Sequence, residues 1–142
     1  MTEILFYILK ESAESRPAFA CRLAEQLWKK GKKVLIHTEN AAQSTVIDQL
    51  LWDFRADSFV PHQVLEASEI PPVQQVFISH LDSPPPQLMD VLINLNPKQP
   101  LFFSQFEKLA EIIDADPSVK QHGRLRYKFY QERGYPIETY NQ

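Results

Sequence analysis

Glycine is scarce in this chain of 142 residues, which has three glycines beside eleven prolines. Loops that cradle phosphates need several glycines in series, because the backbone must come close to the ligand. Neither the G-x-G-x-x-G nor the G-x-x-x-x-G-K-[ST] pattern occurs in the chain. A nucleotide site of either common type is therefore nearly excluded, and we expect no cofactor.

Cysteine and long apolar runs are also missing. Cys21 is the one cysteine of the chain, so no internal disulfide can form and no cysteine cluster can bind a metal. No apolar run approaches the roughly 20 residues that cross a bilayer. The first residues carry no basic region before their apolar stretch, which is unlike a secretory signal. We expect a cytoplasmic protein with no membrane contact.

Apolar residues at 44% and charged residues at 23% are ordinary values for a globular protein, and the length suits one domain over 1–142. Apolar runs and helical periodicity predict an α/β fold, whose first strand, helix and second strand form a right-handed parallel crossover. Strands are predicted over 4–9, 34–37, 73–80, 89–95 and 109–113, and helices over 13–30, 40–51, 101–106 and 117–133.

The histidines are the natural candidates for catalysis. His37 and His80 end predicted strands, where active-site groups of α/β proteins gather. Ser79 and His80 are adjacent in a strand and point to opposite faces, so they do not form a relay. No spacing joins the histidines to a nucleophile or to a set of metal ligands. A small hydrolase is therefore a weak alternative.

The last predicted helix carries a basic and aromatic stripe, because residues three and four apart are neighbours on a helix surface. Its members are Lys120, Arg124, Tyr127, Lys128 and Gln131. An arginine can hold a carboxylate through two parallel hydrogen bonds, and a tyrosine ring offers an apolar face. The stripe suits an acidic, partly apolar ligand; a solvated helix face with no partner is the alternative.

Charge is unevenly spread along the chain. Residues 117–142 carry five Lys or Arg against two Glu, whereas the chain as a whole has a net charge of −3. A protein that coats nucleic acid is usually basic overall. One basic end on an acidic body better matches one acidic partner element. A nucleic-acid-binding module that uses the basic helix remains the second alternative, and its affinity would fall steeply with salt.

Trp52 and Phe59 are large aromatic residues that flank a polar segment. Such rings can belong to the core, or they can anchor a protein interface. The pattern alone favours neither.

Several short motifs, taken in order along the whole chain, resemble the chi subunit family of bacterial DNA polymerase III. They are Phe6-Tyr7, Lys30-Gly31-Lys32-Lys33-Val34-Leu35-Ile36, Leu51-Trp52, Ser58-Phe59-Val60-Pro61-His62, Val91-Leu92-Ile93-Asn94-Leu95, Arg124-Leu125-Arg126-Tyr127-Lys128 and Gly134-Tyr135. The resemblance implies a Rossmann-like three-layer domain, with a mostly parallel central sheet and no nucleotide-binding loop.

The resemblance also implies an accessory subunit with two protein partners and no catalysis. One partner is the psi subunit of the clamp loader, and Trp52 and Phe59 match the residues that face it. The other is the acidic C-terminal tail of single-stranded DNA-binding protein, which ends in a Pro-Phe carboxylate.

For the tail, the resemblance implies that Arg124 takes the terminal carboxylate, Tyr127 walls a pocket for the phenylalanine and Lys128 attracts the aspartates. Gln131 stands where well-known members of the family have an arginine, and Lys120 can compensate for it. A helicase-type protein is a further candidate partner at the psi-facing surface. We expect no direct DNA binding.

Overall fold

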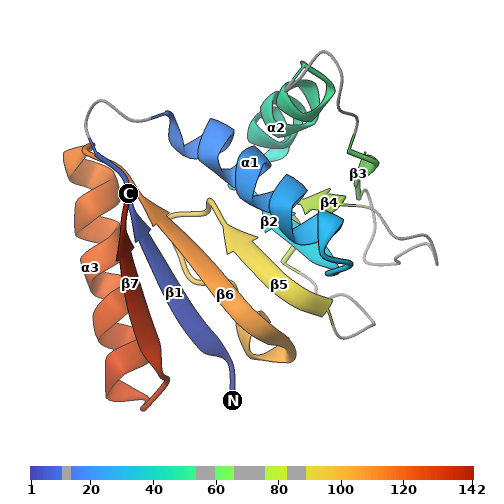
Figure 1. Cartoon of the computed structure of the whole chain (residues 1–142). Helices are drawn as coiled ribbons and strands as arrows, with labels where there is room; N and C mark the ends of the chain where they lie inside the picture. The colour runs from blue at the N-terminus through green and yellow to red at the C-terminus, as the bar shows by residue number, and fades with distance from the viewer. Residues whose placement is uncertain (11–13, 54–59, 66–75, 83–88) are drawn as a thin grey trace.

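A computed structural model gives the fold and describes residues 1–10, 14–53, 60–65, 76–82 and 89–142 (Figure 1). Its elements in chain order are β1 (Glu3–Ile8), α1 (Arg16–Lys29), β2 (Val34–His37), α2 (Ala41–Asp53), β3 (His62–Val64), β4 (Val76–Ser79), β5 (Met89–Asn94), the 3₁₀ turn η1 (Phe103–Gln105), β6 (Phe106–Ile113), α3 (Pro117–Glu132) and β7 (Ile137–Asn141).

The seven strands form one sheet in the order β3-β4-β2-β5-β6-β1-β7, and every pairing between them is parallel. Parallel strands are buried on both faces when helices cover them, which explains their continuous apolar runs. The predicted α/β class is therefore confirmed, and the sheet is more uniform than the mostly parallel one expected.

Two apolar clusters lie on the two faces of the sheet. One contains buried residues of α1 and α2, such as Phe19 and Ile47. The other contains Phe103 of η1 and Tyr130 of α3. Helices thus cover both faces in three layers, with α3 near one end of the sheet and α2 near the other (Figure 1).

The helix ends follow local chemistry. The Ser15 hydroxyl accepts a hydrogen bond from the Ala18 amide and caps α1. Gly31, with φ of 79°, follows α1 in the left-handed region that glycine adopts without strain. Asn40 caps α2 by accepting from the Gln43 amide at 2.8 Å.

Several predicted elements need correction. The helix predicted over 101–106 is only the turn η1, because Phe106 already belongs to β6. The strand predicted over 109–113 is longer, and it is not the last, since β7 follows α3. Strand β3 was not predicted at all.

One apolar side chain of α2 faces solvent. Val46, next to the buried Ile47, is 49% exposed. Ser44, Ile47 and Leu51 take the buried positions instead. A buried serine conceals the helical period from sequence, because it reads as polar. Residues 73–75 of the predicted strand lie outside the described residues.

Candidate functional site

Helix α3 carries the predicted stripe, and its bounds follow from its sequence. The Asp116 carboxylate accepts hydrogen bonds from the amides of Ser118 at 2.8 Å and Val119 at 3.3 Å. Pro117 occupies the first helical position, where its missing N–H costs nothing. Gly134 follows the helix with φ of 79°. The helix spans Pro117–Glu132, which agrees to within one residue with the range predicted over 117–133.

A buried polar network fixes the rotation of α3 on the sheet. Arg126 donates through Nε to Glu111 Oε2 at 3.0 Å and through Nη1 to the Pro97 carbonyl at 2.6 Å. The Tyr130 hydroxyl donates to the same carboxylate at 2.7 Å, and Asn94 Nδ2 donates to it at 3.0 Å. Burial raises the pKa of Glu111, against the opposing effect of Arg126 and the other donors. Buried charges persist only when paired and hydrogen-bonded in this way.

With this rotation fixed, three members of the stripe meet at one cavity of about 270 Å³. Its described lining residues are Phe6, Ile8, Ile113, Lys120, Gly123, Arg124 and Tyr127. We call it the α3 pocket. Residues of β1 and of the end of β6 form its floor, and α3 forms one wall.

The α3 pocket combines an apolar interior with cations at its mouth. The rings of Phe6 and Tyr127 pack at 5.2 Å between centroids, so Tyr127, 37% exposed, continues the apolar floor. Lys120 and Arg124 both lie on the exposed part of α3. A ligand with one apolar group beside a carboxylate matches this arrangement, because each half finds its complement.

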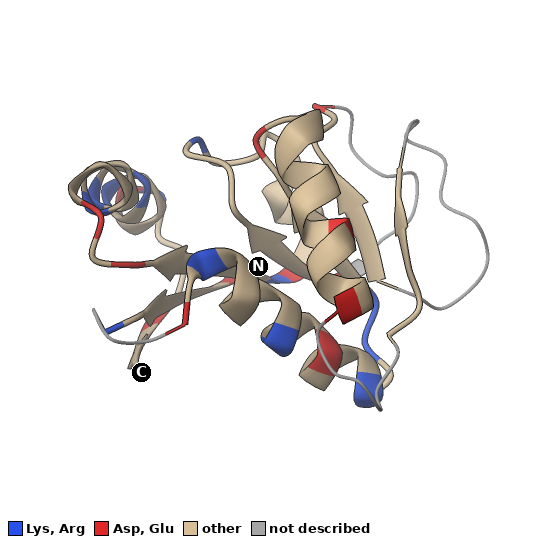
Figure 2. Cartoon of the chain, turned by 90° about the horizontal axis from the view of Figure 1, so that it is seen from above, with Lys and Arg blue, Asp and Glu red and all other residues tan. Residues whose placement is uncertain are grey.

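Lys128 and Gln131 are not among the described residues that line the pocket. Successive helical residues turn by about 100°, which places Lys128 opposite the buried Gly123–Arg126–Tyr130 line of α3. Its Nζ lies 3.9 Å from Glu132, and both side chains are exposed. Basic positions recur along α3 (Figure 2). Of these, Lys120 and Arg124 are among the described residues that line the pocket.

Sequence reasoning missed the residues that line the pocket from the sheet. Phe6 and Ile8 alternate along β1 with Tyr7, which belongs to the opposite cluster. That alternation is hidden in an uninterrupted apolar run. The glycine signal at Gly123 was available, because a glycine inside a helix often marks close packing.

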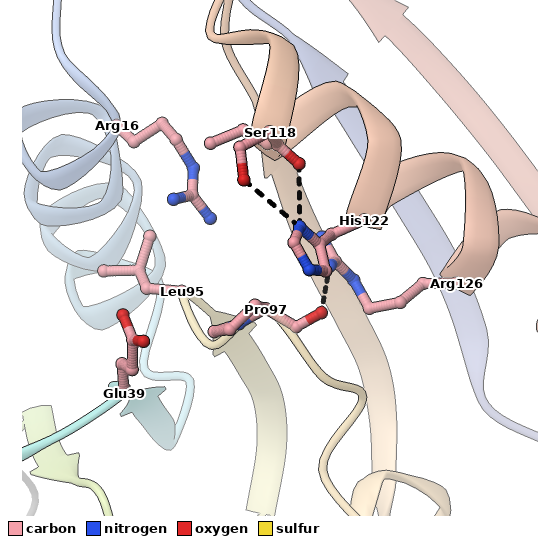
Figure 3. Close-up of a pocket in the computed structure, with 8 residues that line it drawn as sticks. Arg16, Glu39, Leu95, Pro97, Ser118, His122 and Arg126 are labelled. Atoms are coloured by element: carbon pink, nitrogen blue, oxygen red, sulfur yellow. Dashed lines mark hydrogen bonds between the residues drawn. The ribbon is translucent and has the colours of Figure 1, made fainter.

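A second cavity, of about 330 Å³, lies at the carboxyl ends of the strands (Figure 3). Its cations already have partners. Arg16 Nε donates to the Ile112 carbonyl at 2.8 Å, and Arg126 is paired with Glu111 and Pro97. His122 Nδ1 lies 2.8 Å from the Ser118 carbonyl. These groups tie α1, the loop after β5 and α3 together, and we assign them to structure.

Among the described residues, the histidines predicted as catalytic alternatives, His37 and His80, are not joined to an accessible nucleophile. His80 Nδ1 lies 3.4 Å from the Ser44 hydroxyl, but that hydroxyl is 2.6 Å from Thr38 Oγ1 and Ser44 is 1% exposed. His37 is 2% exposed, and burial lowers its pKa to about 4. A substrate cannot reach the serine. Within the described ranges, no three His, Cys, Asp or Glu side chains gather as a metal site.

Trp52 lies in the last turn of α2 rather than in the loop that follows, and it is 56% exposed. Its ring packs edge-on against His62 of β3 at 5.2 Å. Phe59, predicted with it, lies outside the described residues.

In the part of the chain that the structure describes, no helix is long and apolar enough to cross a membrane.

Comparison with known proteins decides the family. A family profile described as "DNA polymerase III chi subunit, HolC" matches residues 1–138. The chain belongs to the DNA polymerase III chi subunit family. It is 36% identical over 141 residues to the protein named DNA polymerase III subunit chi of Pseudomonas aeruginosa, covering 99% of this chain and 96% of that one.

Two further chi subunits agree. The Haemophilus influenzae protein is 37% identical over 139 residues, covering 96% of this chain and 94% of the relative. The Escherichia coli protein is 30% identical over 148 residues, covering 98% and 97%. The resemblance drawn from the sequence motifs is confirmed. A chi subunit is an accessory subunit of the DNA polymerase III holoenzyme, and this places the chain in DNA replication without a catalytic role of its own.

Proposed function

We propose that this chi-family chain is an adaptor of the clamp loader, which binds the psi subunit through one surface and the acidic C-terminal tail of single-stranded DNA-binding protein through the α3 pocket. The polymerase would thereby be coupled to coated single-stranded DNA. The observation that supports the tail site is the meeting of Lys120, Arg124 and Tyr127 at an apolar cavity.

The pocket fits the end of such a tail in two ways. A terminal phenylalanine ring can enter between Phe6, Ile113 and Tyr127, and burying such a side chain contributes about 1.5–3 kcal/mol. The terminal carboxylate can accept paired hydrogen bonds from Arg124, which are stronger than neutral ones. A disordered tail loses entropy on binding, so we expect a dissociation constant of about 1 μM.

The cations contribute unequally. Lys120 and Arg124 line the pocket, so they are placed to contact the last residues of the tail. Lys128, with 72% of its side chain exposed, is placed to attract upstream aspartates at longer range. Exposed ion pairs contribute only about 0.2–1 kcal/mol each. The anchored ring and its carboxylate should therefore dominate the affinity.

The competing interpretation, a nucleic-acid-binding module, is less well supported by the same surface. The net charge of −3 opposes binding to phosphate. The acidic tail remains the better ligand.

The test is calorimetry with a synthetic acidic peptide that ends in Pro-Phe, and with the same peptide lacking its last residue. Arg124→Ala should weaken binding of the full peptide by about 30-fold or more, since about 2 kcal/mol of charge-assisted hydrogen bonding is lost. The wild-type protein should bind the shortened peptide just as poorly.

Lys128→Ala is the matched control, because it removes a cation from the same helix outside the pocket. Its effect should be below about threefold and should vanish at high salt. Unchanged affinity of Arg124→Ala, or an equal loss in both variants, would overturn the tail site.

A further inference from the structure

Strand β7 lies beside β1, whose residues Phe6 and Ile8 line the α3 pocket. The opposite side of α3 is filled, because Phe129 packs edge-on against Phe103 at 6.2 Å. Lys120, Arg124 and Tyr127 lie on the other flank of the helix, above β1. Beyond β1 the sheet ends with β7, and residues 138–141 of that strand are exposed.

The register of the sheet shows which side chains of β7 adjoin the pocket. Phe6 is paired with Thr139, and Ile8 is paired with Asn141. Neighbouring strands are about 4.8 Å apart, and paired residues point to the same face. Thr139 and Asn141 therefore flank the two β1 residues that form the pocket floor. Ile137, on the same face, packs against the apolar cluster that contains Tyr130.

Charge on β7 is segregated between its two faces. Its one carboxylate, Glu138, is paired with Leu5 and accepts a hydrogen bond from Tyr140, whose ring stacks on Tyr7 of the α1-side cluster. The face toward α3 carries Ile137, Thr139 and Asn141, and no acidic group. This face of β7 therefore presents no acidic side chain to an acidic peptide that passes over it.

The main chain of β7 adds unused hydrogen-bonding groups. The Pro136 carbonyl accepts from Ile4, and the Gln142 amide donates to Ile8, so alternate residues of β7 face β1. The amides and carbonyls of the intervening residues, Thr139 among them, point away from the sheet at its edge. Exposed edges of this kind receive extended peptides.

We propose that the acidic tail leaves the α3 pocket across β7, and that the hydroxyl of Thr139 and the side-chain amide of Asn141 hydrogen-bond its upstream carboxylates. This inference rests on the proposed function, because it concerns the path of the same tail. It assigns β7 as the second wall of the site, opposite the cations of α3. The occupant is an acidic peptide in extended conformation.

The experiment places one carboxylate on each face of β7. Thr139→Glu adds it on the pocket face, and Tyr140→Glu adds it one residue later on the opposite face. In calorimetry with the full acidic peptide, Thr139→Glu should weaken binding by about fivefold at low salt and less at high salt. Tyr140→Glu should change it by less than about twofold.

A second peptide, ending in Pro-Phe but with its acidic residues replaced by serine, locates the effect. Thr139→Glu should bind this peptide as the wild type does, because the terminal anchor is untouched. Equal affinities of wild type and Thr139→Glu for the acidic peptide, or equal losses in both variants, would overturn the path across β7. Failure of the wild type to bind any tail peptide would instead overturn the proposed function.

Discussion

Arg124 and Arg126 lie two positions apart on α3 and have opposite surroundings. Arg126 is 3% exposed and is paired with Glu111, whereas Arg124 is exposed at the pocket. Removing one partner of a buried ion pair costs about 3–5 kcal/mol, because the other charge is left uncompensated. A change at Arg126 would therefore unfold or displace α3, and it would say little about tail binding. Arg124 is the informative position.

His37 makes the stability of the fold depend on pH. It ends β2, and burial lowers its pKa from the ordinary 6.5 to about 4, with nearby His80 adding to the shift and Asp82 opposing it. As the pH falls, the unfolded chain takes up a proton before the folded one does. The stability that is fully present above about pH 6.5 is therefore lost as the pH falls toward 4.

Between pH 7.5 and 5 this single group should cost about 2 kcal/mol of unfolding free energy. Urea denaturation of wild type and His37→Gln at both pH values measures it, since the glutamine variant lacks the titration. The remaining titratable groups affect both proteins alike. The difference in unfolding free energy between wild type and His37→Gln should be smaller by about 2 kcal/mol at pH 5 than at pH 7.5. Parallel pH profiles of the two proteins would contradict the lowered pKa of His37.

At the scale of the element, Gly123 sets how closely α3 approaches the sheet. A Cβ at this position would lie 2.5 Å from Ile113 Cδ1, and both residues line the α3 pocket. Alanine has a helix propensity about 1 kcal/mol better than glycine, which offsets much of the overpacking cost of about 1–3 kcal/mol. The Ile113 methyl must move to make room, and it does so at the pocket.

Gly123→Ala should thus keep its stability within about 1–2 kcal/mol and lose about tenfold in tail affinity. Gly134→Ala is the matched control, because it has open space but φ of 79°. It should lose about 1 kcal/mol of stability and retain affinity. Chemical denaturation and peptide calorimetry on both variants separate the two effects. Full affinity in Gly123→Ala would show that the pocket tolerates the methyl group.

The elements differ in how far sequence could predict them. The ends of α3 were predictable, because Asp116, Pro117 and Gly134 each have a local chemical reason. Strand β7 was not, since Ile137–Asn141 contains one aliphatic residue and is mostly exposed. An edge strand with one solvated face has little apolar pattern to detect. For this reason the helix side of the site could be predicted from residue spacing, whereas the wall proposed at β7 required coordinates.

At the scale of the whole molecule, the two proposed partner surfaces are far apart in the fold. Trp52 lies on α2, whose apolar side joins the α1 cluster and which neighbours β3. The α3 pocket lies on β1 and α3, on the opposite face and toward the other end of the sheet. Sites without shared contacts behave additively. An adaptor that holds two partners at once needs this separation.

Trp52→Ala should therefore weaken psi association by about 30-fold, because an exposed tryptophan anchor contributes about 2 kcal/mol or more at an interface, and it should leave tail binding unchanged. Arg124→Ala should do the reverse, and the double variant should lose both activities by the same factors as the single ones. Pull-down with psi and calorimetry with the tail peptide measure the two interactions separately.

Val46→Ala, on another face of α2 and also exposed, is the control that should retain psi. If Trp52→Ala still captured psi, the ring would serve the contact with His62 or another partner; if it lost tail binding as well, the two surfaces would be coupled through the sheet.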